Sequence, residues 1–231
     1  MIESGSASKY LFYAIGEIAL VVLGILIALQ INNWNEDKKR RNTEVNLLLE
    51  LKDNLTTDLH DIRYNINEDS ETLLSNEIIL DQFEKKIPFH DSLSKHYGGL
   101  QRTSTFVENI SAFENLKTLG FDLISNDTLR RKISNLYSAR YNYIDEINTN
   151  TSNRFVWDLL NPLLLKNLRS NVVLEDAVPL DPISLSKNST FLEALRWHIA
   201  IKKFSINLNK DTEIEIVKVI EFIQKEIGDF E

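Results

Sequence analysis

The sequence contains no cysteine. Disulfide bonds, thiolate zinc sites and cysteine nucleophiles are therefore excluded. Glycine and proline are also scarce, at 7 and 4 of 231 residues, which favours long helices over a turn-rich β-sheet protein. Basic residues number 26 against 34 acidic ones, a formal net charge of -8. Because nucleic-acid binding requires clustered cations, we expect no nucleic-acid partner.

One long apolar stretch, "LFYAIGEIALVVLGILIALQI", occupies residues 11–31, and Glu17 is its only charged residue. At a rise of about 1.5 Å per residue, a helix of this length covers roughly 30 Å, the thickness of a bilayer's hydrocarbon core. A cleaved signal peptide would need a more basic start and a small-residue cleavage site. We therefore predict a disordered tail over residues 1–9, a transmembrane helix over residues 10–34 and a helical domain over residues 35–231.

Residues of the kind found at membrane interfaces flank this stretch. They are the aromatic residues Tyr10, Tyr13 and Trp34 and the basic residues Lys38, Lys39, Arg40 and Arg41. Only Lys9 precedes the stretch, so the count of basic residues places the C-terminal domain on the cytoplasmic side of the plasma membrane.

One face of the predicted span carries small residues and the single carboxylate. Residues spaced alternately by three and four positions form this face: Ala14, Glu17, Val21, Gly24, Ala28 and Ile31. The Gly24 and Ala28 pair allows two helices to approach closely in lipid, which predicts a homo-oligomer. Three interpretations of Glu17 remain open: an interfacial group that reaches water, a helix-packing group, and an ion or proton carrier. No second intramembrane charge supports transport.

Two stretches resemble a known family. "KYLFYAIGEIALVVLGILIALQINNWNE" and the later "ISAFENLKTLGFDLISNDTLRRKISNLY" are similar to DUF6090, a family of uncharacterised membrane proteins common in Bacteroidota. The resemblance implies a bacterial single-pass membrane protein with a helical domain of unassigned activity. Family members tend to have a basic N-terminal tail, which favours a periplasmic domain, whereas residues 1–8 are not basic here. The side of the membrane therefore stays open.

The remainder of the chain predicts an all-α fold, with the membrane helix continuing into a bundle of three or four long antiparallel helices. The first helix should continue to about Gln82. The other expected elements are a helix over residues 111–119 that ends at Gly120, a helix that starts at Thr128 and bends or ends at Pro162, a loop over residues 170–188, and a helix from Thr190 to Phe230. Residues 207–211 are expected to interrupt the last helix, and "TEIEIV" alternates like a strand.

No catalytic, phosphate-binding or metal-binding motif is present, so we expect no enzyme activity, metal or cofactor. His90, Asp91 and His96 share one loop without metal-site spacing, and His198 is expected to be a partly buried core residue. Four arginines, Arg130, Arg131, Arg140 and Arg154, fall on different helix faces and favour salt bridges over an anion site. Three functions follow: a membrane-tethered interaction or scaffold module, a ligand sensor signalling through a protein partner, and a transport subunit using Glu17.

Overall fold

The computed structural model describes the backbone of residues 4–228 and the side chains of residues 11–228. The chain divides into two compact units, residues 1–47 and residues 48–231. The helices and strands are α1 (Ser4–Glu84), η1 (Asp91–Leu93), α2 (Ser94–Gly99), α3 (Ser111–Leu119), η2 (Phe121–Leu123), α4 (Asp127–Asn135), η3 (Leu136–Tyr141), α5 (Asn142–Ile147), η4 (Asn148–Asn153), η5 (Phe155–Leu160), α6 (Asn161–Asn167), β1 (Leu168–Val172), β2 (Asp176–Pro179), α7 (Pro182–Ser186) and α8 (Ser189–Gly228).

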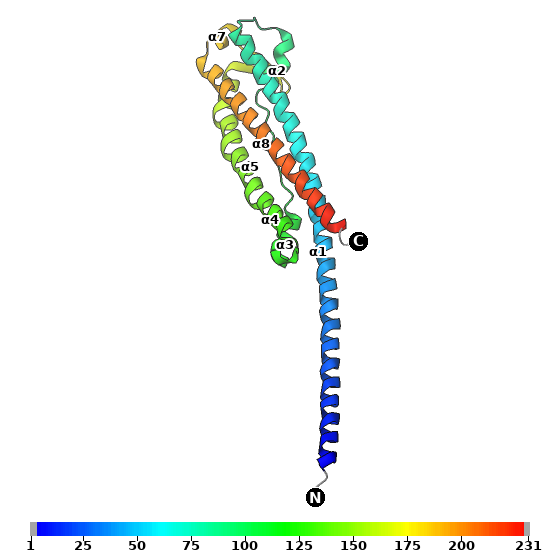
Figure 1. Ribbon diagram of the computed structural model, residues 1–231. Helices are drawn as coiled ribbons and strands as arrows, with labels where there is room; N and C mark the ends of the chain where they lie inside the picture. The colour runs from blue at the N-terminus through cyan, green and yellow to red at the C-terminus, as the bar shows by residue number, and fades with distance from the viewer. Residues whose placement is uncertain (1–3, 229–231) are drawn as a thin grey trace. The chain divides into compact units, whose positions relative to one another are not determined.

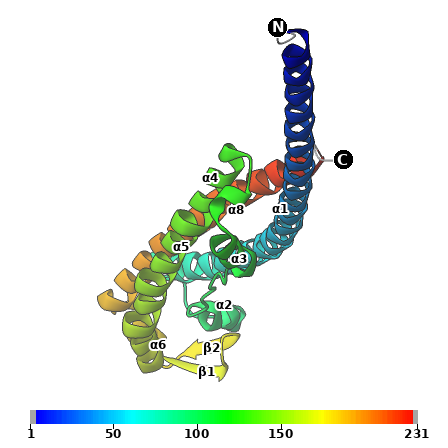
Figure 2. The same ribbon diagram turned by 90° about the horizontal axis from the view of Figure 1, so that it is seen from below.

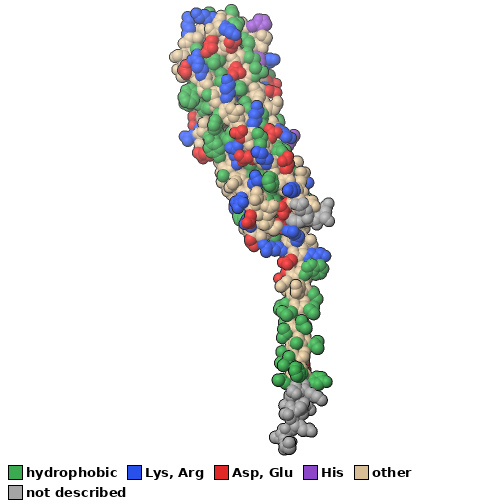
Figure 3. All heavy atoms as spheres, viewed as in Figure 1, with side chains coloured by type: hydrophobic (Ala, Val, Ile, Leu, Met, Phe, Trp, Pro, Cys, Tyr) green, Lys and Arg blue, Asp and Glu red, His purple; other side chains and the backbone are tan. Residues whose placement is uncertain are grey.

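The first unit is the N-terminal part of α1. Within the described residues, α1 is the one helix long and apolar enough to cross a membrane, and none of its apolar window is buried. Figure 3 shows hydrophobic side chains along this part of the helix and charged side chains spread over the second unit. The backbone is helical from Ser4, so helix replaces the expected disordered tail over residues 4–9. Residues 1–3 lie outside the described part.

The second unit is a bundle of three long helical stretches, as the sequence predicts (Figure 1). The first stretch is α1 from Leu48, the second runs through residues 127–167, and the third is α8. The second stretch contains three π-helical turns, η3, η4 and η5. Pro162 lies in the first turn of α6, and the helix continues past it to Asn167.

Contacts along the bundle give the direction of each helix. Residue 76 on α1 contacts residue 198 on α8, and residue 69 contacts residue 202, so α8 runs antiparallel to α1. Residue 152 contacts residue 205 and residue 126 contacts residue 226, so α8 is antiparallel to the second stretch as well. Residues 58 and 141 are in contact, and residues 79 and 83 pack with residues 156–164. The first two stretches therefore run parallel to each other, so the predicted antiparallel arrangement is correct for α8 but wrong for this pair.

This parallel arrangement requires a connection that returns along the bundle, and residues 102–110 provide it. This extended segment lies along α1: Ser104 bonds to Asp69, the Asn109 amide to Asp58, and Asn115 in the following α3 to Glu50. Helix α3 ends as predicted at Gly120, whose φ of 96° favours glycine. Asn126 accepts hydrogen bonds from the Thr128 and Leu129 amides and so caps α4.

A short hairpin occupies part of the segment that we expected to be a loop over residues 170–188. Strands β1 and β2 pair antiparallel, with Arg169 opposite Val178, and lie near α2 and α6 (Figure 2). Gly98 of α2 packs directly on the hairpin, where a Cβ at residue 98 would lie 2.3 Å from the Glu175 carbonyl carbon. The prediction failed because this strand pairing is decided by tertiary contact with α2.

Helix α8 is continuous, so two predictions for it were wrong. Residues 207–211 do not interrupt it, and residues 212–217 form helix and not strand. Leu208, Thr212, Ile216 and Val219 are all buried at helical spacing, and their packing overrides the alternating pattern of "TEIEIV". Asn188 caps the start of α8 by accepting a hydrogen bond from the Phe191 amide.

Candidate functional site

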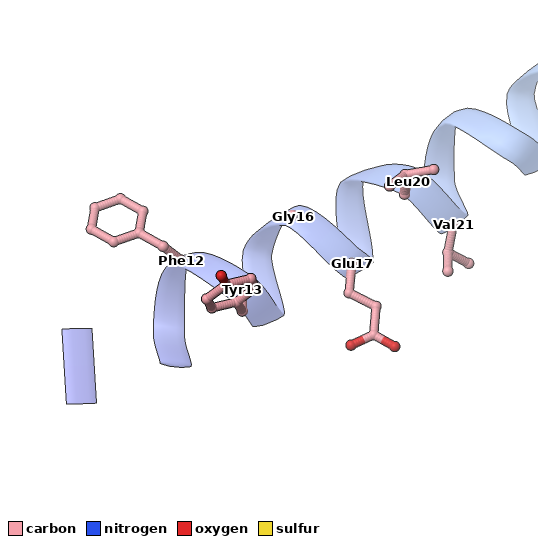
Figure 4. Close-up of a pocket in the computed structure, with 6 residues that line it drawn as sticks. All are labelled: Phe12, Tyr13, Gly16, Glu17, Leu20 and Val21. Carbon is pink, nitrogen blue, oxygen red and sulfur yellow. The ribbon is translucent and has the colours of Figure 1, made fainter. Parts of the chain in front are cut away.

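The predicted small-residue face of α1 is exposed throughout the described residues. Figure 4 shows Glu17 and Val21 extending from the same side of the helix, in an open groove that is also lined by Tyr13 and Gly16. A Cβ built at Gly24 meets nothing within 4 Å. The backbone thus places Ala14, Glu17, Val21, Gly24 and Ala28 along one face, and a partner for that face would have to come from outside the described chain.

The residues predicted to lie at the membrane interface have exposed side chains in the described part of the chain. Tyr13 and Trp34 are 80% and 67% exposed, and the Lys38 ammonium lies 5.7 Å from the centre of the Trp34 ring. Lys39, Arg40 and Arg41 continue the basic cluster on the exposed surface of the same helix. The side chain of Tyr10 lies outside the described residues.

A polar layer crosses the middle of the second unit. Lys202 of α8 donates a hydrogen bond of 2.6 Å to Asp69 of α1, and both side chains are about 95% buried. Ser104 of the returning segment donates to the same carboxylate oxygen at 2.9 Å. Ser152 and Ser205 lie 3.4 Å apart between the second stretch and α8. All three helices therefore contribute polar groups to a layer bounded by apolar packing.

His198 is fully buried in this layer, deeper than the partial burial we predicted. The Asn76 amide nitrogen donates to the Thr72 carbonyl, so its oxygen faces His198 Nδ1, 3.1 Å away, as an acceptor. His198 is therefore the neutral tautomer with its proton on Nδ1. Burial, with a smaller contribution from the Lys202 charge, lowers the pKa of His198 to about 3. Its ring stacks on Phe155, with ring centres 6.0 Å apart.

Two buried acceptors near the π-helical turns have no protein donor among the described residues. They are Nε2 of His198 and Oδ1 of Asn161. Buried acceptors of this kind are generally satisfied by ordered water.

A row of carboxylates on α1 holds the returning segment. Asp61 accepts from the Val107 amide at 3.1 Å, and Asp58 accepts from the Asn109 amide and the Tyr141 hydroxyl, both at 2.8 Å. Burial raises the pKa of Asp58 to about 6, although both of its hydrogen bonds favour the charged form. Burial and the neighbouring Asp58 charge together raise the pKa of Tyr141 far above its usual range.

The loop histidines have structural contacts. His90 Nδ1 accepts from the Ser92 amide at the start of η1, and His96 Nδ1 lies 3.2 Å from the Ser75 hydroxyl. Burial, followed by the charge of Lys95, lowers the pKa of His96. Within residues 11–228, no group of three or more His, Asp and Glu side chains is arranged to hold a metal ion.

Three of the four arginines form ion pairs, as their distribution predicts. Arg130 pairs with Asp127, Arg154 lies 3.8 Å from Asp158, and Arg140 lies 3.4 Å from Glu215. The first two pairs are local to their helices, whereas the third joins the second stretch to α8. The four residues do not form one anion site.

Sequence reasoning missed the polar layer. Asp69 was visible only as a polar interruption of an apolar pattern, and nothing connected it to Lys202, 133 residues later in the chain. Polar residues at the buried positions of two helices were the available signal. Pairing them required the direction and register of α8, which depend on the complete fold.

An exposed apolar N-terminal helix and a three-helix bundle with a polar central layer define the class of this protein. The chain belongs to DUF6090, a family of unknown function, whose sequence profile matches residues 17–189. No curated protein and no solved structure matches the chain.

Proposed function

We propose that the protein is a single-pass, membrane-anchored scaffold that self-associates through the small-residue face of α1. The bilayer is its first partner, and a second copy of the chain is the next. The single observation that carries the proposal is the complete exposure of the apolar stretch at residues 11–31. Apolar patches of this extent are otherwise found at membrane or protein contacts.

The composition of the stretch favours the bilayer as its surroundings. Its length matches the hydrocarbon thickness, and all its backbone hydrogen bonds are satisfied within the helix, as lipid requires. A helix that packed on a soluble partner would need one polar face, whereas here apolar side chains are exposed on every side. Trp34 and Lys38 mark the expected boundary with water.

Self-association is favoured by Gly24 and Ala28. Without side-chain bulk at these positions, two helices approach closely, and van der Waals contact holds them together in lipid. Glu17 on the same face would be covered by the partner helix, where a protonated carboxyl can form a hydrogen bond between helices. The oligomer therefore places the single carboxyl of the stretch away from lipid tails.

Gly24→Leu tests this association. The new side chain meets open space within its own chain, so any effect reports on a partner. Ala19→Leu is the matched control, because Ala19 is also exposed and lies about 160° from Glu17 around the helix, on the opposite face. We expect crosslinking of the full chain in membranes to yield dimers for the wild type and Ala19→Leu, and markedly fewer for Gly24→Leu. Equal crosslinking of all three would refute the packing face.

A further inference from the structure

A pocket of about 290 Å³ lies between the second helical stretch and α8, apart from the small-residue face and the polar layer. Its walls come from the end of α4, the start of η3 and the C-terminal half of α8. The lining residues are Lys132, Asn135, Leu136, Glu215, Lys218 and Val219. Buried Leu136 and Val219 supply its apolar surface, and the other four lining residues are polar or charged.

The two lysines give this pocket excess positive charge. Among the described residues, neither Lys132 nor Lys218 forms an ion pair with an acidic side chain. Lys132 lies 4.7 Å from the centre of the Phe222 ring, a cation–π contact that holds the ammonium near the pocket. Both ammonium groups line the same pocket.

The one acidic side chain of the pocket, Glu215, is already paired. It lies 3.4 Å from Arg140 of η3, and Arg140 is also 4.0 Å from Asp211. The pairing cancels most of the repulsion that Glu215 would exert on an anion. Counting these five groups, three cations and two carboxylates, leaves a net charge of +1 around the pocket.

Arg140 adds a second unusual feature next to the pocket. Its Nε atom is buried and has no hydrogen-bond partner within the described residues. It lies on η3, and π-helical turns occur frequently at functional sites. An unpaired buried N–H donor is costly, which is consistent with a site that is completed by an acceptor such as a ligand oxygen or water.

We propose that this pocket binds a phosphate group. Lys132 and Lys218 supply two charged donors, and the Asn135 amide supplies a neutral one, from two different helices. Lysine is a common phosphate ligand because its compact charge does not need the planar geometry of a carboxylate. Leu136 and Val219 provide an apolar surface for the carbon atoms next to the phosphate. A small organic phosphate and a phospholipid headgroup share this chemistry.

The proposal does not depend on the membrane anchor or on self-association, since the pocket lies wholly within the second unit. A phosphate ligand would bridge α4 and α8, and it would stabilise the bundle by its binding energy. The site therefore also offers the sensor interpretation a defined ligand class.

The test is equilibrium dialysis of radiolabelled inorganic phosphate against the full chain in phosphatidylcholine nanodiscs. We expect saturable binding that Lys132→Gln and Lys218→Gln each weaken about tenfold, the usual effect of losing one charged hydrogen bond. Lys210→Gln is the matched control, because it removes the same charge from an exposed position of α8 outside the pocket. It should bind like the wild type. Thermal melting of each variant verifies that the bundle is intact.

Competition then separates the two sources of phosphate. Displacement by soluble glycerol 3-phosphate assigns the pocket to a small organic phosphate. Displacement only when phosphatidic acid is added to the nanodisc assigns it to a lipid headgroup. The proposal is overturned if the wild type shows no saturable binding, or if the two pocket variants bind phosphate as tightly as Lys210→Gln.

Discussion

Lys202 of α8 and Asp69 of α1 form an ion pair of 2.6 Å in the interior of the bundle, and both side chains are about 95% buried. The two residues are 133 positions apart in the sequence. Their pairing fixes the register of α8 against α1, since a shift of one helical turn would leave both charges buried without a partner. The polar layer therefore selects one arrangement of an otherwise apolar bundle.

Asp69→Asn should destabilise the bundle by about 3–5 kcal/mol, because it leaves the Lys202 charge buried and unpaired. Lys203→Gln breaks the pair with Glu77, which is about half exposed, and should cost no more than about 1 kcal/mol. Thermal melting of the full chain, followed by circular dichroism, compares the two variants. The double variant Asp69→Leu/Lys202→Met should recover much of the loss. Equal melting of Asp69→Asn and Lys203→Gln would contradict the assigned role of the pair.

Asp58 predicts a pH dependence of stability. Its pKa of about 6 in the fold exceeds the unfolded value of 3.8, so its contribution to stability is present below pH 4 and is lost as the pH rises through 6. In Asp58→Asn this dependence is absent. The stability of the variant relative to wild type should therefore increase from pH 4 to pH 7, by on the order of 2 kcal/mol after solvent screening. Melting temperatures of the wild type and Asp58→Asn measured over this pH range provide the test. A difference in melting temperature that stays constant with pH would contradict the raised pKa of Asp58.

Gly98→Ala should destabilise the contact between α2 and the hairpin. The new Cβ would lie 2.4 Å from the Asp176 backbone nitrogen, so the backbone itself must move, at a cost of about 1–3 kcal/mol. Gly228→Ala is the control, since a Cβ at this position meets nothing within 4 Å. Chemical or thermal unfolding should separate the two variants. A Gly98→Ala variant as stable as Gly228→Ala would show that the hairpin packs differently.

Asn126 has two separable roles. Its oxygen caps α4, and its amide nitrogen donates to Glu226 of α8. Asn126→Asp keeps the capping oxygen and loses the donor, whereas Asn126→Ala loses both. We expect Ala to lower stability by about 1–2 kcal/mol through the cap. Asn126→Asp should keep the cap but place a second carboxylate beside Glu226. Its loss of stability relative to the wild type should therefore decrease at low pH, which melting curves would show. A pH-independent deficit for Asp would argue against the contact with Glu226.

The sequence predicted the features that depend on local signals. The end of α3 at Gly120 and the start of α4 after Asn126 follow from capping chemistry that acts over a few residues. The end of α1 at Glu84 followed from its periodicity. By contrast, the direction of the second stretch depends on residues 102–110 returning along α1, and the pairing of Asp69 with Lys202 depends on the register of α8. These relationships are long-range, and no local pattern encodes them.

The two candidate sites also differ in whether local sequence signals can identify them. The small-residue face of α1 is a single-helix property, so its residues could be identified from spacing alone. The phosphate pocket combines Lys132 with Lys218 across two helices, and the arginines considered from the sequence are mostly engaged in ion pairs. Only the fold shows which basic residues remain unneutralised.

Labelling of single cysteines tests the membrane-anchored account most directly, because the natural sequence has none to remove. Ser6→Cys, Val22→Cys and Ser138→Cys place one thiol before, within and after the apolar stretch. A membrane-impermeant maleimide is applied to cells whose outer membrane has been made permeable and whose inner membrane is intact. We predict that residues 6 and 138 react on opposite sides of the inner membrane, and that residue 22 reacts on neither side. Labelling of residues 6 and 138 from the same side, or of residue 22 from either side, would contradict the account.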